Sequence, residues 1–369
     1  MGILVTGANG FIGQNLIAEL NVRGFEEVYE VTRETTEDQL QSYCSKARFV
    51  FHLAGVNRPQ DPSEFMKGNY EFTKKMLTML SNSGNKCPIL LTSSIQAEHN
   101  NPYGESKRAG EQLVFDYGQA NGVNVFVYRL PNVFGKWSKP NYNSAVATFC
   151  HNISRDLPIQ IGDPDVNLNL VYIDDVIKEF ISDLEGETEP NGNFSEVKVT
   201  HEIRLGELVD KLYSFKEIRS NLSVPDLSDP LTKKLYSTYL SFLPEDQFSY
   251  ELKMNQDNRG SFTEVLRTVD RGQVSVNVSK PGITKGNHWH HTKNEKFLVV
   301  SGEGVIRFRK PGEDEVIEYF VSGNKLEVVD IPVGYTHNIE NLGSTDMVTL
   351  MWVNEPFDPS KPDTHFLEV

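Results

Sequence analysis

The pattern of apolar residues changes once along the chain, and this change most limits the folds that the chain can adopt. Short apolar runs such as residues 2–5 alternate with helical patterns such as residues 106–119 in the first part. Beyond about residue 250 only short alternating runs follow, separated by Gly and Pro. The first pattern is typical of an α/β Rossmann-type doubly wound parallel sheet, the second of an all-β barrel. We therefore predict two domains, 1–245 and 252–369, with the boundary near 243–252.

The local signals also predict individual elements. Helices are expected where apolar residues recur at helical spacing, and strands where runs are short and rich in β-branched residues. The predicted helices cover residues 10–19, 64–80, 106–119, 145–153 and 206–216. The predicted strands cover residues 2–5, 27–32, 49–53, 89–91, 123–128, 273–278, 296–300, 305–309, 315–321 and 347–353.

Composition excludes several classes of protein. A formal net charge of -15 and a pI near 5.1 argue against nucleic acid or an anionic membrane surface as a partner. The chain has no run of 18 apolar residues, so we expect no membrane span. The cysteines Cys44, Cys87 and Cys150 are odd in number and form no C-x-x-C pair. They suit packing roles in a reducing compartment, and we expect a cytoplasmic protein.

A glycine-rich turn follows the first apolar run. Gly7, Gly10 and Gly13 allow a tight turn, a close approach of backbone to a pyrophosphate, and packing of the next helix against the strand. Its position at the start of a strand–helix–strand pattern strengthens the prediction of a nicotinamide dinucleotide site. The residues predicted to bind this cofactor here are Gly7, Asn9, Gly10, Phe11, Ile12 and Gly13.

The second strand ends at Arg33 rather than at an acidic residue. A carboxylate at this point binds the ribose 2′-hydroxyl of NAD, whereas an arginine suits the 2′-phosphate of NADP. Arg33 therefore favours NADP(H).

Tyr103 and Lys107 lie four residues apart at the start of a predicted helix, which puts them on one face. A phenol with the ordinary pKa of about 10 is a poor acid–base group at neutral pH. A neighbouring ammonium lowers that pKa, and a fall of about three units corresponds to roughly 4 kcal/mol. Ser93 and Ser94 follow a predicted strand and offer a hydroxyl for a substrate oxygen. The combination indicates a reductase site.

A second group of chemically active residues lies in the predicted barrel. His288 and His290 project from one face of a strand, Glu295 follows, and His337 comes from a later strand. Three imidazoles and a carboxylate form a suitable ligand set for zinc or another divalent metal with one position open. We predict a metal site at these four residues.

The first part of the chain resembles the extended short-chain dehydrogenase/reductase family. The resemblance rests on the glycine turn, Tyr103 with Lys107, and the segments 52–55, 129–135 and 171–176. It implies Ser94, Tyr103 and Lys107 as catalytic residues and Asn132 as a substrate contact. It also implies that Leu53, Ala54 and Gly55 line the cofactor, together with Tyr103 and Lys107. Only eight residues separate Ser94 from Tyr103, fewer than is usual, so Ser93 stays an alternative to Ser94.

The second part resembles the cupins. Residues 282–302 match the pattern G-x5-H-x-H-x4-E-x6-G, and residues 332–341 match P-x-G-x2-H-x3-N. The resemblance implies a cupin barrel with His288, His290, Glu295 and His337 on the metal. It does not define the reaction, because cupins include isomerases, oxygenases and binding modules.

The whole arrangement resembles the capsular polysaccharide synthesis enzymes that join such a reductase to a metal cupin. This resemblance implies a UDP-linked 2-acetamido-2,6-dideoxy-4-ketohexose substrate, C3 epimerisation in the cupin, NADPH-dependent C4 reduction, zinc, and a homodimer. The route leads toward UDP-N-acetyl-L-fucosamine. Epimerisation has to come first, because C4 reduction removes the carbonyl that acidifies the C3 proton. Lys296, Tyr335 and His365 are equal candidates for the base.

Two other readings stay open at this point. In one, the chain is a 4-ketosugar reductase alone, and the cupin is a structural or regulatory dimerisation module. In the other, the chain is a sensor that binds NADP(H) without turnover. The pair of Tyr103 and Lys107 argues against the sensor, since sensors on this fold typically lack it.

Overall fold

The computed structural model describes residues 2–188 and 194–369. Contacts divide the chain into two compact units, Met1–Phe215 with Ser228–Pro244 and Lys216–Leu227 with Glu245–Val369. The segment Lys216–Leu227 falls within the range predicted for the first domain, yet it packs with the second unit. Its attachment includes a hydrogen bond of 2.7 Å from the backbone N–H of Arg267 to the carbonyl of Leu222.

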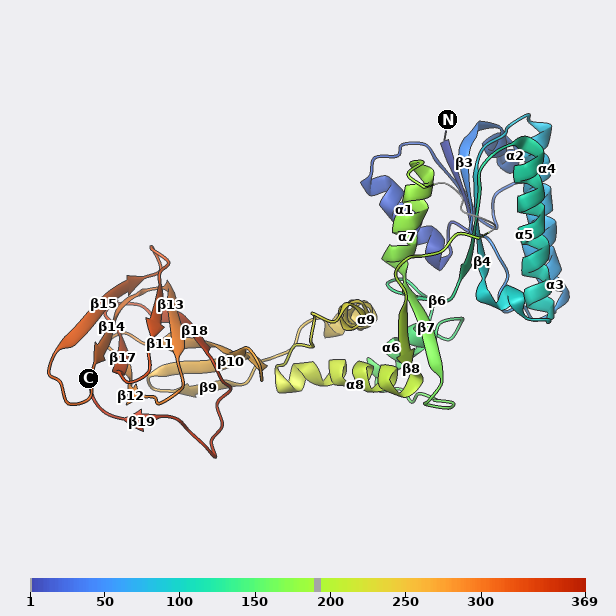
Figure 1. Ribbon diagram of the computed structural model, residues 1–369. Helices are drawn as coiled ribbons and strands as arrows, with labels where there is room; N and C mark the ends of the chain where they lie inside the picture. The colour runs from blue at the N-terminus through green and yellow to red at the C-terminus, as the bar shows by residue number, and fades with distance from the viewer. Residues whose placement is uncertain (1, 189–193) are drawn as a thin grey trace. The chain divides into compact units, whose positions relative to one another are not determined.

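A five-stranded parallel sheet forms the centre of the first unit, with strand order β2-β1-β3-β4-β5. Helices cover both faces, as Figure 1 shows, with α1 and α7 on one side and α2, α4 and α5 on the other. The predicted doubly wound sheet is confirmed. Because the chain order reverses between β1 and β3, the carboxyl edge at this point is the expected ligand edge. The strands are Gly2–Thr6 (β1), Val28–Val31 (β2), Ala47–His52 (β3), Ile89–Ser94 (β4) and Val125–Leu130 (β5).

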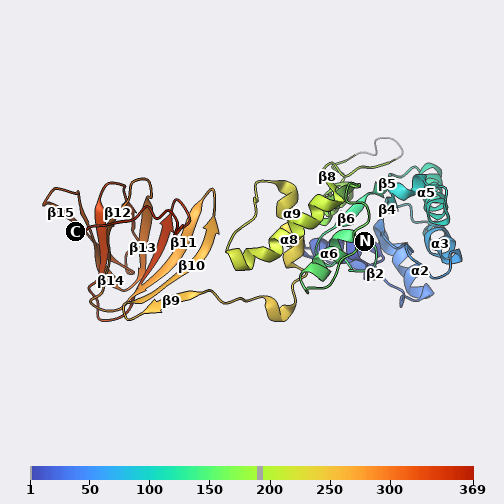
Figure 2. The same cartoon turned by 90° about the horizontal axis from the view of Figure 1, so that it is seen from below.

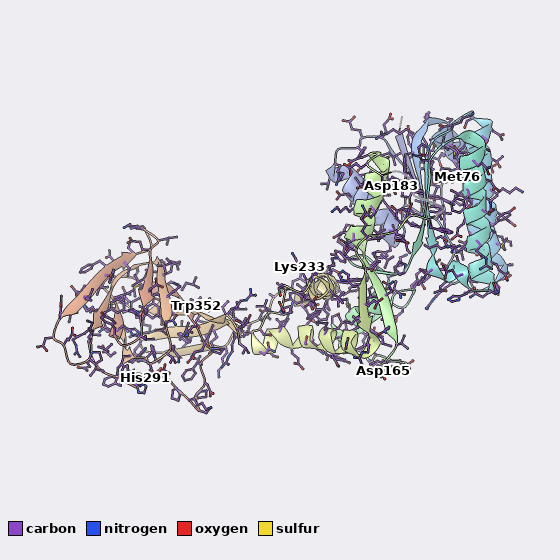
Figure 3. All side chains as sticks on the ribbon, viewed as in Figure 1. Met76, Asp165, Asp183, Lys233, His291 and Trp352 are labelled. Carbon is purple, nitrogen blue, oxygen red and sulfur yellow. The ribbon has the colours of Figure 1, made fainter. Side chains whose placement is uncertain are left out.

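The two faces of this sheet bury separate apolar clusters. Val5 and Phe51 point toward α1 and α7, whereas their neighbours Leu4 and Val50 point toward α2, α4 and α5. Met76 of α4, labelled in Figure 3, is fully buried in the second cluster. Successive strand residues face opposite sides, so a strand covered on both faces is apolar throughout.

The helices differ from the prediction in their limits and in one interruption. The predicted helix 64–80 consists of α3 (Ser63–Met66), a π-helical turn η1 (Lys67–Glu71) and α4 (Phe72–Asn82). Helix α5 (Pro102–Asn121) begins four residues before the predicted start, because Asn101 caps it. Helix α2 (Glu37–Lys46) was not predicted, although Thr36 and Gln39 form a capping box before it.

The rest of the first unit carries a small mixed sheet of β6, β7 and β8. Its strands are Asn132–Phe134 (β6), Asn167–Tyr172 (β7) and His201–Arg204 (β8), and η2 (Ile95–Glu98) is a 3-10 turn after β4. The helices are Phe11–Val22 (α1), Ala145–Ile153 (α6), Ile173–Leu184 (α7), Leu205–Asn221 (α8) and Pro230–Leu240 (α9). The helices predicted at 145–153 and 206–216 are confirmed as α6 and as part of α8, whereas α7 and α9 were not predicted.

The second unit is built from two antiparallel sheets, which Figure 2 shows as strands lying side by side. One has the order β16-β13-β18-β11-β10-β9 and the other β15-β14-β17-β12-β19. The predicted all-β, cupin-like domain is confirmed. Its elements are Glu245–Gln247 (η3), Met254–Asp257 (β9), Gly260–Thr268 (β10), Gly272–Ser279 (β11), Thr284–Trp289 (β12), Glu295–Ser301 (β13), Glu303–Arg309 (β14), Val316–Ser322 (β15), Val328–Ile331 (β16), Thr336–Asn341 (β17), Met347–Val353 (β18) and His365–Phe366 (β19).

The interior of this unit has an apolar part and a polar part. Phe297, Ile306 and Phe308 belong to a buried apolar cluster. Strand β11 instead buries polar side chains and leaves its alternating valines half-buried. These polar residues are Gln273, Ser275, Asn277 and Ser279, and hydrogen bonds link them in pairs. A polar inner wall suits a polar ligand better than it suits core packing.

Among the described helices, none is long and apolar enough to cross a membrane. Cys44, Cys87 and Cys150 are free thiols in the apolar interior, which agrees with the packing role expected for them.

His52 joins three elements of the first unit at the ligand edge. It is 1 % exposed, and its Nδ1 lies 2.7 Å from Thr6 Oγ1. Its Nε2 lies 2.8 Å from Thr73 Oγ1, whose proton goes to the Asn69 carbonyl. Nε2 therefore carries the hydrogen and Nδ1 accepts from Thr6. Burial, and to a lesser extent the nearby Lys107, lower the pKa of His52 to about 3, so the ring stays neutral.

We predict that His52 makes the first unit less stable as the pH falls. An unfolded histidine has a pKa of about 6.5, so the unfolded chain binds this proton before the folded one does. The folded state should lose about 2 kcal/mol between pH 7.5 and pH 5 through this residue. Hydrogen exchange of the β1 and β3 amides at both pH values should show this loss in the parent protein and not in His52→Gln.

The exposed His99 provides the control, because His99→Gln should keep the full pH dependence of the parent protein. Equal pH dependence in the parent and in His52→Gln would contradict the assignment.

Candidate functional site

The glycine turn forms the first part of the site, between β1 and α1. Gly7 has φ +70, and a Cβ atom on it would lie 2.8 Å from the Ala54 nitrogen. A Cβ atom on Gly13 would lie 2.3 Å from the Gly7 carbonyl oxygen, so α1 packs directly on the turn. Gly10 precedes α1 without a side-chain cap, so no side chain takes up the first helical N–H groups. Such a helix start binds phosphate. Asn9 and Gly10 are exposed, and Phe11 and Ile12 are half-buried.

Arg33 lies two residues beyond the end of β2 and is exposed. The backbone N–H of Ala8 in the glycine turn donates to the Val31 carbonyl at 3.3 Å. This bond ties the turn to the end of β2, so Arg33 lies two residues after a residue that contacts the turn. That is the place where a 2′-phosphate would need a cation.

Lys107 lies on α5 next to the loop after β3. Its Nζ donates to the Thr92 carbonyl at 3.1 Å, and a Cβ atom on Gly55 would lie 3.1 Å from the same Nζ. Removal from water lowers the pKa of Lys107 to about 8, although Glu111 acts in the opposite direction. Leu53, Ala54 and Gly55, predicted to line the cofactor, thus lie between the glycine turn and Lys107.

Tyr103 stands one turn before Lys107, and its hydroxyl donates to Asn57 Oδ1 at 3.0 Å. Burial raises the pKa of Tyr103, while a hydrogen bond with Ser94 lowers it by less. This direction is opposite to the lowering by Lys107 that the sequence suggested. The reason is geometric, since the Lys107 ammonium is directed to the Thr92 carbonyl rather than to the phenol.

The structure separates the two serines by their partners. Ser93 is buried and its hydroxyl donates to Glu111, which forms an ion pair of 2.7 Å with Arg129. Ser94 is half-buried, its hydroxyl accepts from the Gln96 N–H at 3.2 Å, and it is near enough to Tyr103 to lower the pKa of the phenol. Ser94 is therefore the serine beside the phenol, and Ser93 is engaged in the protein interior.

Asn69 in the π-helical turn is a site residue that sequence reasoning missed. Its Oδ1 accepts from the Val56 N–H at 2.8 Å, and its Nδ2 donates to the Val56 carbonyl at 3.1 Å and to Ser106 Oγ at 3.0 Å. The side chain holds the loop after β3 against α5, next to Lys107. An extra residue in a helical turn cannot be read from apolar spacing, so the sequence offered no clear signal.

Asn132, predicted to contact the substrate, is exposed on β6. Its Nδ2 donates to the Asn169 carbonyl at 3.3 Å. The side chain of Asn132 is therefore accessible to a ligand, two residues after the end of β5.

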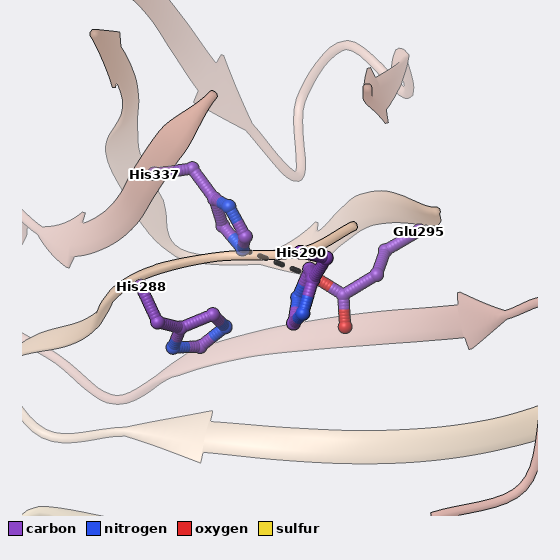
Figure 4. A group of neighbouring side chains, drawn as sticks. All are labelled: His288, His290, Glu295 and His337. Atoms are coloured by element: carbon purple, nitrogen blue, oxygen red, sulfur yellow. Dashed lines mark ion pairs between the residues drawn. The ribbon is translucent and has the colours of Figure 1, made fainter. Parts of the chain in front are cut away.

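The four predicted metal ligands come together in the second unit, as Figure 4 shows. One ligand atom from each lies within 4.8 Å of all the others. Glu295 Oε2 lies 3.1 Å from His337 Nε2 and 3.6 Å from His290 Nε2. The sequence separates His288 from His337 by about fifty residues, and pairing of β12 with β17 places them opposite each other.

The donor atoms of this cluster fit a divalent metal. His290 Nε2, Glu295 Oε2 and His337 Nε2 are buried without a hydrogen-bond partner, which is costly unless a cation binds them. Burial lowers the pKa of His288 to about 4. Burial also opposes ionisation of Glu295, but His290 and His337 outweigh it and hold its pKa at about 2. A carboxylate with three imidazoles is a ligand set that zinc binds.

Asp363 in the C-terminal segment fixes the loop after the first two ligands. Its carboxylate accepts from the backbone N–H groups of His291, Thr292 and Lys293 at 2.7 to 3.1 Å. Its carbonyl accepts from Nδ1 of His290, which leaves Nε2 of that ring for a metal. These bonds outweigh desolvation and lower the pKa of Asp363 strongly.

We predict that Asp363→Ala weakens metal binding about 10- to 100-fold, because the loop after His290 loses its bonds to the carboxylate and the carbonyl that holds the His290 ring is no longer fixed in place. Competition with a chromogenic chelator on the purified protein measures the affinity. Asp358→Ala is the matched control, because the Asp358 carboxylate lies in the same segment and accepts hydrogen bonds from Ser360. Equal zinc affinity in both variants would contradict the role of Asp363.

Comparison with known proteins agrees with this geometry. Residues 3–193 match the NAD dependent epimerase/dehydratase family, and residues 255–365 match the polysaccharide biosynthesis C-terminal domain. The chain is 48% identical over 369 residues to a Pseudomonas aeruginosa protein named UDP-2-acetamido-2,6-beta-L-arabino-hexul-4-ose reductase, covering 100% of this chain and 99% of that one.

Solved structures show the same relationship. The capsular polysaccharide assembling protein CapF from Staphylococcus aureus is 57% identical, with a TM-score of 0.94 and complete coverage of both chains. A UDP-glucuronic acid 4-epimerase from Bacillus cereus, 20% identical with a TM-score of 0.55, covers 66% of this chain and 96% of its own, and it shares the fold. The resemblance to capsular polysaccharide synthesis enzymes is confirmed, and the chain belongs to the NAD dependent epimerase/dehydratase family, with a polysaccharide biosynthesis C-terminal domain.

Proposed function

We propose that the first unit reduces the C4 ketone of a UDP-linked 2-acetamido-2,6-dideoxy-4-ketohexose. The observation that carries this proposal is the group of Ser94, Tyr103 and Lys107 at the carboxyl edge of the sheet, beside a phosphate-binding turn. Its support from relatives is the match to a curated reductase along the whole chain. The substrate is taken from the name of that relative.

The residues divide the work of reduction among them. The bound nicotinamide supplies the hydride for C4. Tyr103 donates its phenolic proton to the C4 oxygen, and Ser94 holds that oxygen by a hydrogen bond. Lys107, anchored to the Thr92 carbonyl, presents a cation next to Gly55, where the cofactor ribose would lie. Asn57, which accepts the Tyr103 hydroxyl at 3.0 Å, keeps the phenol oriented before substrate binds.

We propose NADPH rather than NADH as the reductant. The exposed Arg33 beside the glycine turn supports this choice, because a cation there favours a 2′-phosphate. Equal or better kcat/KM with NADH would contradict it.

We predict that Tyr103→Phe lowers kcat for NADPH oxidation with this ketosugar about 10²- to 10⁴-fold, because the proton donor is lost. Cofactor binding should persist, which fluorescence titration of NADPH measures. The exposed Tyr213 provides the control, and Tyr213→Phe should oxidise NADPH at the parent rate. Full activity of Tyr103→Phe would exclude the proposed acid.

The second unit, in this proposal, epimerises C3 of the same ketosugar before reduction. The proton on C3 is acidic because it lies next to the C4 carbonyl. A divalent metal on His288, His290, Glu295 and His337 would act there as a Lewis acid toward the ketone oxygen. The orphaned donor atoms of this cluster support a bound metal, and zinc suits the ligand set.

The test combines heavy water with metal removal. The intact protein with NADPH should give a product with deuterium and inverted configuration at C3, seen by NMR. The metal-free protein should lose C3 exchange about 100-fold or more, while C4 reduction by the first unit continues. Reduction without C3 exchange in the metal-loaded protein would instead favour a reductase whose second unit is a structural or regulatory module.

We also propose a homodimer. Large apolar side chains are exposed along β15, β16 and the segment between them, and exposed apolar surface of this kind can mark a site of protein–protein contact. A second copy would cover them, and a single-chain mass in light scattering would contradict the proposal. These residues are Ile317, Tyr319, Phe320, Leu326 and Val328.

We propose a cytoplasmic location as well. The free buried cysteines agree with a reducing compartment. Fractionation of cells would test this location.

A further inference from the structure

A cavity of about 620 Å³ opens beside the metal-ligand cluster within the second unit. Its size is within the range of small-molecule sites. His288, Glu295 and His337 line one part of it, and Lys285 and Asn277 line another. A molecule in this cavity would therefore contact the metal position and the Lys285 amine together.

Lys285 faces the cavity because the backbone of β12 is irregular. In a regular strand, residues three apart point to opposite faces, so Lys285 and His288 would not share a side. Here Lys285 pairs with Ile339 and His288 pairs with His337, and the register shifts between them. Ile339 and His337 are two apart on β17 and both point inward.

The register shift is a β-bulge, and its extra residue is Asn287. Asn287 has φ +60 and the preceding Gly286 has φ +107, both in the left-handed range. The Asn287 side chain accepts from Asn338 Nδ2 at 2.9 Å, which stabilises the irregular backbone. Bulges next to active sites redirect side chains, and this one directs Lys285 into the cavity with the metal ligands.

The surroundings of Lys285 hold its amine in a defined place. Nζ donates to Asn277 Oδ1 and to the Val278 carbonyl, each at 2.8 Å, and a third acceptor, the Ser261 carbonyl, is only at 3.5 Å. One N–H position is therefore weakly used and available to a ligand. Asn277 cannot turn away freely, since its Nδ2 donates to Ser279 Oγ at 3.1 Å.

Burial and the nearby charges together lower the pKa of Lys285 below its ordinary value. Removal from water lowers the pKa of Lys285, Arg259 lowers it further, and Asp257 raises it. Arg259 and Asp257 pair with each other at 2.7 Å, so they largely cancel. A divalent cation in the same cavity would act in the same direction as Arg259.

The bases considered from the sequence lie elsewhere in the part of the chain that the structure describes. Lys296, Tyr335 and His365 are not among the residues that line the cavity. Lys296 is paired with Asp330, and His365 lies 3.5 Å from Asp363. Lys285 is therefore the lysine that lines this cavity.

We infer that Lys285 is the residue that takes the C3 proton of the ketosugar in the second unit. The inference rests on the proposed epimerisation. The C3–H bond breaks, its electron pair forms the enolate of the C4 ketone, and the proton goes to the neutral Nζ of Lys285. Water then supplies a proton to the opposite face of C3, and the ammonium returns its proton to solvent. Proton and electron counts balance without a further reactant.

Exchange of the C3 hydrogen in heavy water tests this assignment, with the UDP-4-ketosugar as probe and NADPH omitted. Lys285→Met removes the amine, and Lys285→Arg keeps the cation and removes the base. Both variants should lower the exchange rate about 10²- to 10⁴-fold. The control is Lys325→Gln, because Lys325 is exposed and paired with Glu327 in the same unit, and it should exchange at the parent rate.

Metal content and melting temperature of each variant give the second readout, and both should match the parent protein. Parent-like exchange in Lys285→Arg would show that only the charge is needed and would overturn the assignment. Loss of metal from both variants would overturn it as well, by assigning Lys285 to the structure of the metal centre. If the parent protein itself exchanges no C3 hydrogen, the proposed epimerisation is wrong and this inference falls with it.

Discussion

Both sites depend on one constraint, namely that an ionisable side chain removed from water needs a fixed polar partner. For three such side chains the partner is a backbone carbonyl. Lys107 is held by the Thr92 carbonyl, His290 by that of Asp363, and Lys285 by that of Val278. A carbonyl is part of the fold and cannot rotate away, so each group is positioned before any ligand binds. This preorganisation is what acid–base and metal chemistry require.

Irregular backbone makes these positions possible. The π-helical turn directs Asn69 toward the loop after β3, and the bulge at Asn287 directs Lys285 into the cavity. Each irregularity inserts one residue into a regular element, which turns the following side chains to a new direction. Each is also stabilised by an asparagine amide, so the irregular backbone does not leave polar groups unpaired.

The two units offer different chemistry for the proposed sugar-nucleotide substrate. The first offers a helix start and a cation for phosphate next to a proton donor, which favours reduction of a ketone. The second offers a polar wall on β11, including Asn277, and a cluster of metal ligands. In a chain with a net charge of -15, a bound metal would supply the local positive charge that an anionic sugar nucleotide needs.

Much of this could be predicted from the sequence, because some spacings leave little freedom. Gly7, Gly10 and Gly13 after an apolar run predict the turn, and apolar periodicity predicts the parallel sheet. The spacing from His288 to Glu295 predicts a shared set of metal ligands, and the four ligands do meet, although β12 and β13 belong to different sheets. Tyr103 and Lys107 are close because residues four apart on a helix must be.

Only the tertiary structure decided the rest, because it depends on contacts between distant segments. Ser94 rather than Ser93 lies beside Tyr103 since Glu111 engages the other serine. Alternation along β11 could not show that its polar side faces inward. The shift of the Tyr103 pKa and the direction of Lys285 likewise follow from burial and from one inserted residue. Sequence alone determined which chemical groups are present, and packing determined which of them face one another, since a single extra residue reverses the faces of a strand and rotates the following residues of a helix.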